Sequence, residues 1–241
     1  MAIKAVLITG CSDDGIGSGL ALALQQRDYH VFATARDVNK MSKLKDLPNV
    51  TLLALDVRDQ SQITAAVDTV KATAGTLDYL VNNAARNHFM PILDEDLEIT
   101  RKLYDTNVWG PVAVTQAFAP LLIKSHGTIT FITSVSGYIN VPYMGTLPLR
   151  ETLVPNLTLL SRHLRRIKAF DRAHSRRTPS RTCALPRPRS VHCNRCCQTM
   201  GQTYFGDFKL PENSLYKHIE EIIVSRAQGG GWKSQRGFDD V

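Results

Sequence analysis

The sequence lacks any apolar run long enough to cross a lipid bilayer, since no stretch reaches 18 consecutive apolar residues. Its first ten residues turn polar too soon to form the apolar core of a secretory signal peptide. These absences predict a cytoplasmic protein with no transmembrane segment. The 241 residues are enough for one α/β domain with a sizeable core.

Acidic and aromatic residues are scarce in one part of the chain, residues 147–198. This segment holds twelve Lys and Arg against two acidic residues, a single aromatic residue, four of the five cysteines and five of the eleven prolines. The other residues carry 17 basic and 20 acidic side chains, so the net charge of +7 arises in this segment alone. A basic segment without interleaved aromatic residues does not favour a nucleic-acid partner. The composition divides the chain into residues 1–146, 147–198 and 199–241.

Short apolar runs alternate with helical patterns through the first 132 residues. We expect strands over 5–8, 30–34, 51–55, 77–81 and 128–132, and helices over 17–26, 41–47, 61–74 and 96–124. This alternation is typical of βαβ units with right-handed crossovers. The predicted fold class is therefore α/β, a doubly wound parallel sheet of Rossmann type. The basic segment comes soon after the fifth strand, so the sheet is expected to be incomplete after that strand.

A glycine-rich turn, Thr9-Gly-Cys-Ser-Asp-Asp-Gly-Ile-Gly17, follows the first strand and opens the first helix. Glycines in such a turn let the backbone approach a pyrophosphate, which then lies at the positive end of the helix. The candidate cofactor-binding residues here are Gly10, Ser12, Gly15, Ile16 and Gly17. The alternative is an ordinary turn between a strand and a helix. Two aspartates in the turn suit an anion site only if their side chains point outward, which the sequence leaves open.

The residue after the second strand indicates which nicotinamide cofactor is bound. An acidic residue at this point would accept a hydrogen bond from the ribose 2′-hydroxyl of NAD. The chain has Arg36 instead, with Lys40 nearby, and an arginine can pair with a 2′-phosphate. NADP is therefore the favoured cofactor. The alternative is that Arg36 is a solvated surface charge.

Further motifs come after the glycine turn: Leu55-Asp-Val57, Val81-Asn-Asn-Ala84, Thr106-Asn107 and Ile132-Thr-Ser134. In order and spacing they resemble the short-chain dehydrogenase/reductase family. The extra residue in the turn, the Cys-Ser after its first glycine, and residues 205–216 resemble the fungal NADPH-dependent 1-acyldihydroxyacetone-phosphate reductase branch. The resemblance covers residues 1–146, a dinucleotide-binding core, and about 200–229. It implies that Asp56 contacts the adenine ring and that Asn83 lines the cofactor cleft.

The resemblance also implies the chemistry, which is reduction of the carbonyl group of a small-molecule ketone. Negative charge develops on the carbonyl oxygen, so a proton donor and an oxyanion stabiliser are needed. Ser134 matches the family serine that orients the carbonyl, and Asn107 matches the asparagine that holds a relay water, although it could simply kink its helix. The family tyrosine and lysine fall at Leu147 and Glu151, neither of which can do their work. Tyr138 and Tyr143 stand too near Ser134 and have no lysine four residues later.

A reading-frame error in residues 147–198 would explain both the missing pair and the composition. Read one base downstream, the codons of 147–151 permit Tyr-x-Ser-Ala-Lys, and those of 193–198 permit Ala-Thr-Gly-Ala-Val-Lys. The second stretch, followed by Thr199, resembles a family motif that ends in a cofactor-binding threonine. We therefore expect 147–198 to be out of frame, the chain as written to be inactive, and 199–241 to be a truncated remnant of the substrate region.

Other functions stay open for the basic segment. It has cysteines and a histidine near 192–197, but no partner ligand pair at normal spacing, so we expect no metal. Leucines at helical spacing over 157–167 allow a basic amphipathic helix that binds a membrane or a partner. The chain could also be a dinucleotide-binding protein without activity, or a basic interaction protein. The substrate of the enzyme could be a lipid ketone such as acyl-dihydroxyacetone phosphate or a secondary metabolite. Peripheral contact with a membrane or lipid droplet is also open, and so is a homo-oligomer.

Overall fold

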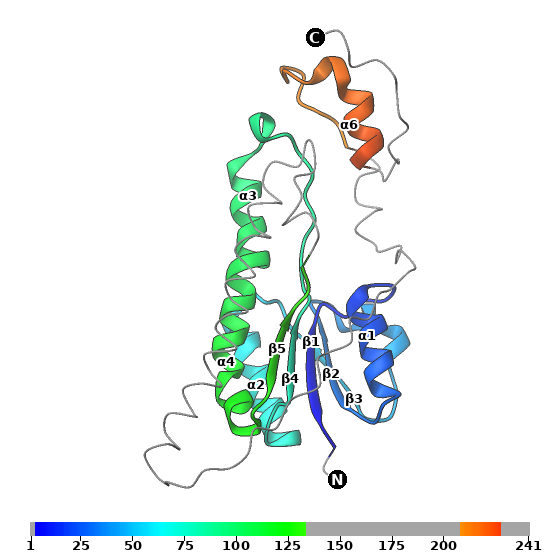
Figure 1. Ribbon diagram of the computed structural model, residues 1–241, viewed down its shortest axis with the longest axis vertical. Helices are drawn as coiled ribbons and strands as arrows, with labels where there is room; N and C mark the ends of the chain where they lie inside the picture. The colour runs from blue at the N-terminus through cyan, green and yellow to red at the C-terminus, as the bar shows by residue number, and fades with distance from the viewer. Residues whose placement is uncertain (1–2, 134–207, 228–241) are drawn as a thin grey trace, which may run out of the picture.

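A computed structural model describes residues 3–133 and 208–227 (Figure 1). Its sheet has five parallel strands in the order β3-β2-β1-β4-β5. The strands are β1 (Ala5–Thr9), β2 (His30–Ala35), β3 (Val50–Ala54), β4 (Tyr79–Asn82) and β5 (Thr128–Phe131). All five strands predicted from the apolar runs are present within two residues of their expected bounds, and the doubly wound fold class is confirmed. The chain from residue 134 onward, where the sheet was expected to be incomplete, lies outside the described residues until residue 208.

The helices agree with the prediction less closely than the strands. The described helices are α1 (Ile16–Gln25), α2 (Gln60–Ala74), α3 (Leu97–Tyr104), α4 (Gly110–Ser125) and α6 (Glu220–Ala227). The short helix expected over 41–47 is present only as a 3₁₀ turn, η2 (Ser42–Leu44), which follows another 3₁₀ turn, η1 (Val38–Lys40). Further 3₁₀ turns are η3 (Ile92–Asp94) and η7 (Lys217–Ile219). The single helix expected over 96–124 is divided by a π-helical turn, η4 (Asp105–Trp109).

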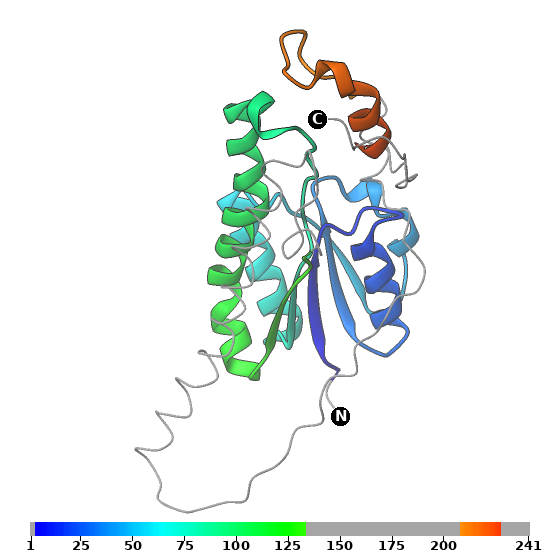
Figure 2. The ribbon, with the colours of Figure 1, turned by 45° about the horizontal axis from the view of Figure 1, so that its top comes forward.

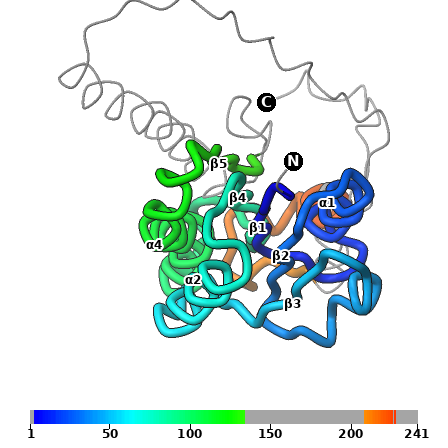
Figure 3. Tube along the Cα trace, turned by 90° about the horizontal axis from the view of Figure 1, so that it is seen from below, coloured from blue at the N-terminus to red at the C-terminus, as the bar shows by residue number. Residues whose placement is uncertain are grey.

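Alternate residues of each strand face opposite sides of the sheet, because side chains alternate along a strand. Val6 and Ile8 of β1 pack with α1 and the η2 turn on one face. Ala5 and Leu7 pack on the other face against α2 and α4, where Phe118 is fully buried. Figure 3 shows α1 on one side of the sheet and α2 with α4 on the other. Helices therefore pack on both faces of the described sheet.

The strand order reverses between β1 and β4. The chain runs outward from β1 to β3 and then returns to the other side of β1 to form β4. Ligands of such sheets bind beyond the carboxyl ends of the strands at this switch point. Figures 1 and 2 both place α6 beyond the same ends of the strands. The candidate site is therefore expected at this edge of the sheet.

Candidate active site

The glycine turn packs directly against the end of β4. Gly10 has φ +75°, and a Cβ atom there would lie 2.8 Å from the Cα of Ala84. A Cβ atom on Gly17 would lie 2.4 Å from the Gly10 carbonyl oxygen and 2.6 Å from Nδ2 of Asn83. Both glycines are therefore required by the close approach of β1, α1 and β4 to one another, before any ligand is considered.

The start of α1 has no side-chain cap. Its N-cap residue is Gly15, no acidic residue lies in its first turn, and the Gly15 carbonyl accepts from Gly19 N–H. The N–H groups of Ile16, Gly17 and Ser18 precede the first residue that finds an acceptor within the helix. The positive end of α1 is thus left for an anion. Ser12 lies in the turn before it, where its carbonyl accepts from Gly15 N–H.

The two aspartates of the turn are directed toward the η2 turn rather than toward α1. Oδ2 of Asp13 accepts hydrogen bonds from the Ser42 N–H and hydroxyl, both at 2.8 Å. Its Oδ1 accepts from Lys43 N–H at 3.1 Å, and Asp14 pairs with the Lys43 ammonium. Burial raises the pKa of Asp13, but the hydrogen bonds from Lys43 and Ser42 outweigh it and hold that pKa below its usual value. The outward orientation left open by the sequence is therefore the one observed.

Cys11 is the buried residue of the same turn. Its side chain is fully buried, its N–H donates to the Thr34 carbonyl at 2.8 Å, and its thiol donates to the Ile8 carbonyl. Burial raises the pKa of this thiol to about 12. Cys11 therefore anchors the turn to β1 and β2 as an inert, protonated side chain.

The ends of β2 and β3 carry a cluster of charges. Arg36 is exposed directly after β2, and Asp56 follows β3 by two residues. Arg58 donates to Asp56 from its backbone N–H, from Nε at 3.0 Å and from Nη2 at 2.6 Å. The hydrogen bond from the Arg58 side chain is the main cause that lowers the pKa of Asp56, and the charge of Arg36 adds to it. Arg58 is a residue of this cluster that the sequence reasoning missed, although its spacing of two from Asp56 was visible.

Asn83 connects β4 to the glycine turn. Its Nδ2 donates to the carbonyls of Thr9 at 2.8 Å and Gly10 at 2.9 Å. The hydroxyl oxygen of Thr9 in turn accepts from the N–H groups of Asn83 and Ala84, both at 2.9 Å. Asn83 therefore lies at the switch point between β1 and β4, and its amide group holds the start of the turn in place.

Asn107 lies in the π-helical turn and is 3% exposed. Its Oδ1 accepts from Arg86 N–H at 2.7 Å and its Nδ2 donates to the Arg86 carbonyl at 2.8 Å. Pro111, four residues later, has no N–H to donate to the Asn107 carbonyl. The N–H of Gly110 donates to the Asp105 carbonyl, five residues back, as in a π-helix. The side chain of Asn107 is thus engaged by the loop after β4, and its main-chain carbonyl receives no donor from Pro111.

The segment that contains α6 packs on the loop after β4. The rings of Phe89 and Phe208 meet edge to face with centroids 5.7 Å apart, and Leu210 and Ile223 are buried beside them. The Ser214 hydroxyl donates to the Asp94 carboxylate. Residues 120 positions apart in the sequence therefore meet beside one small apolar cluster beyond the carboxyl ends of the strands.

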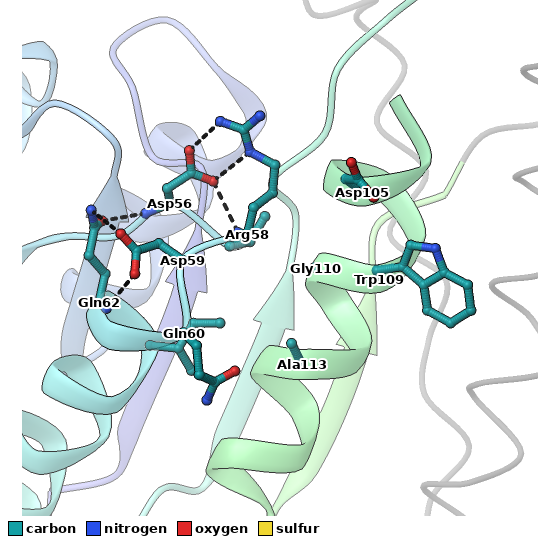
Figure 4. A pocket seen from close by; sticks show the side chains of 11 residues that line it. Asp56, Arg58, Asp59, Gln60, Gln62, Asp105, Trp109, Gly110 and Ala113 are labelled. Atoms are coloured by element: carbon teal, nitrogen blue, oxygen red, sulfur yellow. Dashed lines mark hydrogen bonds and ion pairs between the residues drawn. The ribbon is translucent and has the colours of Figure 1, made fainter. Parts of the chain in front are cut away.

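A separate groove lies between the start of α2 and the start of α4. Its volume is about 700 Å³, and Asp56, Arg58, Asp59 and Trp109 are among the residues that line it. Figure 4 shows Arg58 directed toward Asp56, whereas Trp109 extends away from both. No residue of the glycine turn lines this groove. It lies next to the charge cluster and is not the crevice between β1 and β4.

Several predicted residues lie outside the described residues. These are Ser134, Tyr138, Tyr143, Leu147, Glu151, the histidine and cysteines at 192–197, and Thr199. The structure therefore brings together Gly10, Ser12, Gly15, Ile16, Gly17, Arg36, Asp56, Asn83 and Asn107 along one edge of the sheet, and leaves the others as predictions. Over residues 3–133 and 208–227, no helix is long and apolar enough to span a membrane. In the same part of the chain, no three His, Cys, Asp or Glu residues gather as metal ligands would.

Comparison with known proteins gives matches that cover from about half of the chain to nearly all of it. A family profile described as short chain dehydrogenase matches residues 4–146. The chain is 53% identical to the short-chain dehydrogenase PC-15 of Penicillium crustosum over 231 residues, 95% of this chain and 78% of that protein. It is 53% identical to the short-chain dehydrogenase ptmH of Penicillium ochrochloron over 137 residues, 56% of this chain and 51% of the relative.

Two further matches carry cofactor names. The NADPH-dependent 1-acyldihydroxyacetone phosphate reductase of Schizosaccharomyces pombe is 40% identical over 139 residues, 57% of this chain and 47% of that protein. The chain thus spans about half the length of this relative and of the Penicillium ochrochloron protein. The structure of a Burkholderia cenocepacia short chain dehydrogenase in complex with NADP is similar with a TM-score of 0.60 and 27% identity, covering 67% of this chain and 66% of that one.

Proposed function

The chain belongs to the short-chain dehydrogenase family, and we propose from that membership that it binds NADPH and descends from a carbonyl-reducing oxidoreductase. The observation that carries the proposal is Arg36, an exposed cation directly after β2, on the edge of the sheet where α1 begins. A site for NAD would have an acidic residue at this strand end. The relative named as NADPH-dependent and the similar NADP complex support the same cofactor.

The start of α1 fits a pyrophosphate. Gly15 leaves the helix without a side-chain cap, and no acidic residue occupies its first turn. The carboxylates of Asp13 and Asp14 are hydrogen-bonded to Ser42 and Lys43, away from the N–H groups of α1. The N–H groups of the first turn would hold the phosphates through hydrogen bonds and the helix dipole.

The charge cluster fits the adenosine half of NADP. Arg36 would pair with the 2′-phosphate, because a guanidinium binds phosphate oxygens with two parallel hydrogen bonds. Asp56, the residue assigned to the adenine ring by the family pattern, is held by Arg58. Arg58 therefore fixes the carboxylate of Asp56 and adds positive charge beside the site proposed for the 2′-phosphate.

When bound, the reduced nicotinamide supplies a hydride to the carbonyl carbon of the substrate. The chain must then stabilise and protonate the carbonyl oxygen. We assign the orientation of the carbonyl to Ser134 by sequence, and the retention of a water molecule to the main-chain carbonyl of Asn107. The loss of the Pro111 donor to that carbonyl supports the second assignment, since the Asn107 side chain is engaged by Arg86.

We propose that the chain as written binds the cofactor without turning over a ketone. Leu147 and Glu151 stand where the family pattern has its tyrosine and lysine, and the match to the family profile ends at residue 146. Both facts support an out-of-frame segment over 147–198, whereas the match to the Penicillium crustosum relative spans 95% of the chain and therefore runs through this segment, which supports a segment shared with that relative. The second candidate function is a protein whose natural role is to bind a dinucleotide without catalysis, and the genomic sequence across residues 140–205 distinguishes it from an enzyme whose reading frame has been shifted.

The proposed substrate of the ancestral enzyme is a ketone that carries an apolar chain. The apolar cluster of Phe89, Phe208 and Leu210 lies beyond the edge that would hold the nicotinamide. The acyl-dihydroxyacetone phosphate named for the Schizosaccharomyces pombe relative is one such ketone. A fungal secondary metabolite of similar polarity is the other.

Titration of NADPH and NADH into the full chain tests the cofactor assignment. We expect Arg36→Ala to weaken NADPH binding about tenfold, the lower end of a charge-assisted pair because Arg36 is exposed, and to leave NADH binding unchanged. Arg27→Ala is the matched control, because Arg27 is an exposed arginine at the opposite end of α1. Equal affinity of the wild type for the two cofactors, or an Arg36→Ala variant that keeps its NADPH affinity, would contradict the proposal.

A further inference from the structure

Asp13 links the glycine turn to the segment that follows β2. Its N–H donates to the Lys40 carbonyl at 2.7 Å. Its two carboxylate oxygens accept three hydrogen bonds, two from Ser42 and one from Lys43 N–H. We call this set of four hydrogen bonds the Asp13 clamp. The residues that its carboxylate joins are 29 or 30 positions apart along the chain, so the clamp is a tertiary contact and not part of a local turn.

The clamp holds the middle of the turn, where the neighbouring Asp14 contributes an exposed pair with the Lys43 side chain. The beginning of the turn is fixed by Asn83, which binds the carbonyls of Thr9 and Gly10. The end of the turn closes on itself through the hydrogen bond from Gly15 N–H to the Ser12 carbonyl. Asp13 lies between these two points, and Asp14 beside it has φ +62°. The clamp therefore ties the middle of the turn to the chain between β2 and η2.

Charge alone argues against an acidic residue here. A carboxylate next to bound phosphates repels them, so an aspartate in this turn should weaken binding of a dinucleotide. The carboxylate of Asp13 is instead used to accept N–H groups at the start of η2, as an N-cap does. If charge repulsion dominates, a neutral residue in place of Asp13 should strengthen binding of the dinucleotide. If the hydrogen bonds of the clamp dominate, the same substitution should weaken it.

We propose that Asp13 is a positioning residue for the pyrophosphate of the cofactor. The clamp holds residues 12–15 so that the first N–H groups of α1 stay open to the phosphates, and it does so for NADPH and NADH alike. This inference rests on the proposed dinucleotide site. It differs from the role of Arg36, which concerns the 2′-phosphate alone. Releasing the clamp allows the turn to sample other conformations, and the bound conformation must then be recovered on binding.

Two variants with the same chemical change test the clamp. Asp13→Asn places an amide NH₂ group opposite an N–H donor of Ser42 or Lys43, which breaks one side of the clamp. Asp14→Asn removes the same charge from the next residue, whose carboxylate binds only the exposed Lys43 side chain among the contacts described, and asparagine tolerates the positive φ. Binding of NADPH, NADH and 2′-AMP to the full chain is measured by calorimetry for each variant and for the wild type.

We expect Asp13→Asn to weaken NADPH and NADH by the same factor, about tenfold. Binding of 2′-AMP, which has the 2′-phosphate but no pyrophosphate, should stay within about twofold, whereas Arg36→Ala should lose it. Asp14→Asn should bind both dinucleotides as tightly as the wild type or more tightly. Equal responses of the two asparagine variants, tighter binding by Asp13→Asn, or a loss confined to NADPH would overturn the clamp. A wild type that binds neither dinucleotide would overturn the proposed function itself.

Discussion

Gly17→Ala probes the contact between the glycine turn, α1 and β4 most directly. The added Cβ would lie 2.4 Å from the Gly10 carbonyl oxygen and 2.6 Å from Nδ2 of Asn83. Ordinary contact begins near 3.4 Å, so α1 must move by about 1 Å or the end of β4 must give way. The atom at 2.4 Å belongs to the backbone, and the amide at 2.6 Å is held by its bonds to Thr9 and Gly10. Neither atom is the free end of a flexible side chain, so the clash is not easily absorbed.

The expected cost can be worked out from these contacts. Overpacking of a close contact costs about 1–3 kcal/mol. Losing the two hydrogen bonds of Asn83 adds about 1 kcal/mol each. The better helix propensity of alanine returns about 1 kcal/mol. We therefore expect Gly17→Ala to lower the free energy of unfolding by about 2–4 kcal/mol and to weaken binding of both dinucleotides.

Gly19→Ala provides the control within the same helix. A Cβ atom on Gly19 would meet no atom within 4 Å, so only the propensity difference remains. This variant should be more stable than the wild type by about 0.5–1 kcal/mol. Urea unfolding followed by far-UV circular dichroism measures both variants. If Gly17→Ala proved as stable as Gly19→Ala, the close approach of α1 to β4 could not be what requires the glycine.

The remaining predictions concern stability at acid pH and the reduction of ketones. The pKa values of Asp13, Asp56 and Asp59 lie below the ordinary value of 3.8 in the folded chain, so these carboxylates stabilise the fold above about pH 4 and this contribution is lost as the pH falls through the lowered values. The thermal midpoint should therefore drop as the pH is lowered below about 4, and a flat profile there would contradict this. The chain as written should show no measurable NADPH-dependent reduction across a panel of ketones, since loss of a positioned general acid alone removes about 10²–10⁴-fold in rate. A chain with the shifted frame restored over 147–198 should regain activity and lose it again when its new tyrosine is changed to phenylalanine. Robust turnover by the unrepaired chain would contradict the hypothesis of a shifted reading frame.

The sheet could be predicted because its signal is local. Each strand is a short apolar run that ends near a polar or glycine residue, and strand burial on both faces requires such runs. The edge that carries the site could be inferred from the same pattern, since Gly10, Arg36, Asp56 and Asn83 all come at or just after strand ends. Parallel strands bring their carboxyl ends together, so positions in the sequence indicated positions in space.

Two features of the helices and the turn were not predicted, for different reasons. The π-helical turn had a local signal, because Pro111 removes the donor that Asn107 would need in a regular helix. The Asp13 clamp had none, because nothing in the residues near 13 indicates that Ser42 and Lys43 will lie beside them. The roles of Ser134 and Thr199 stay predictions, since both lie outside the described residues.

Cys11 makes the glycine turn accessible to kinetic measurement. Burial raises the pKa of this thiol to about 12, so the thiol is protonated at pH 8, and its burial excludes reagents as well. Modification of Cys11 therefore requires the turn to open, and its rate reports the free energy of that opening. With the other four cysteines replaced by serine, the rate of thiol modification reports the opening of the glycine turn alone. A bound dinucleotide that holds the turn closed would lower the rate of Cys11 modification in proportion to the fraction of sites that it occupies.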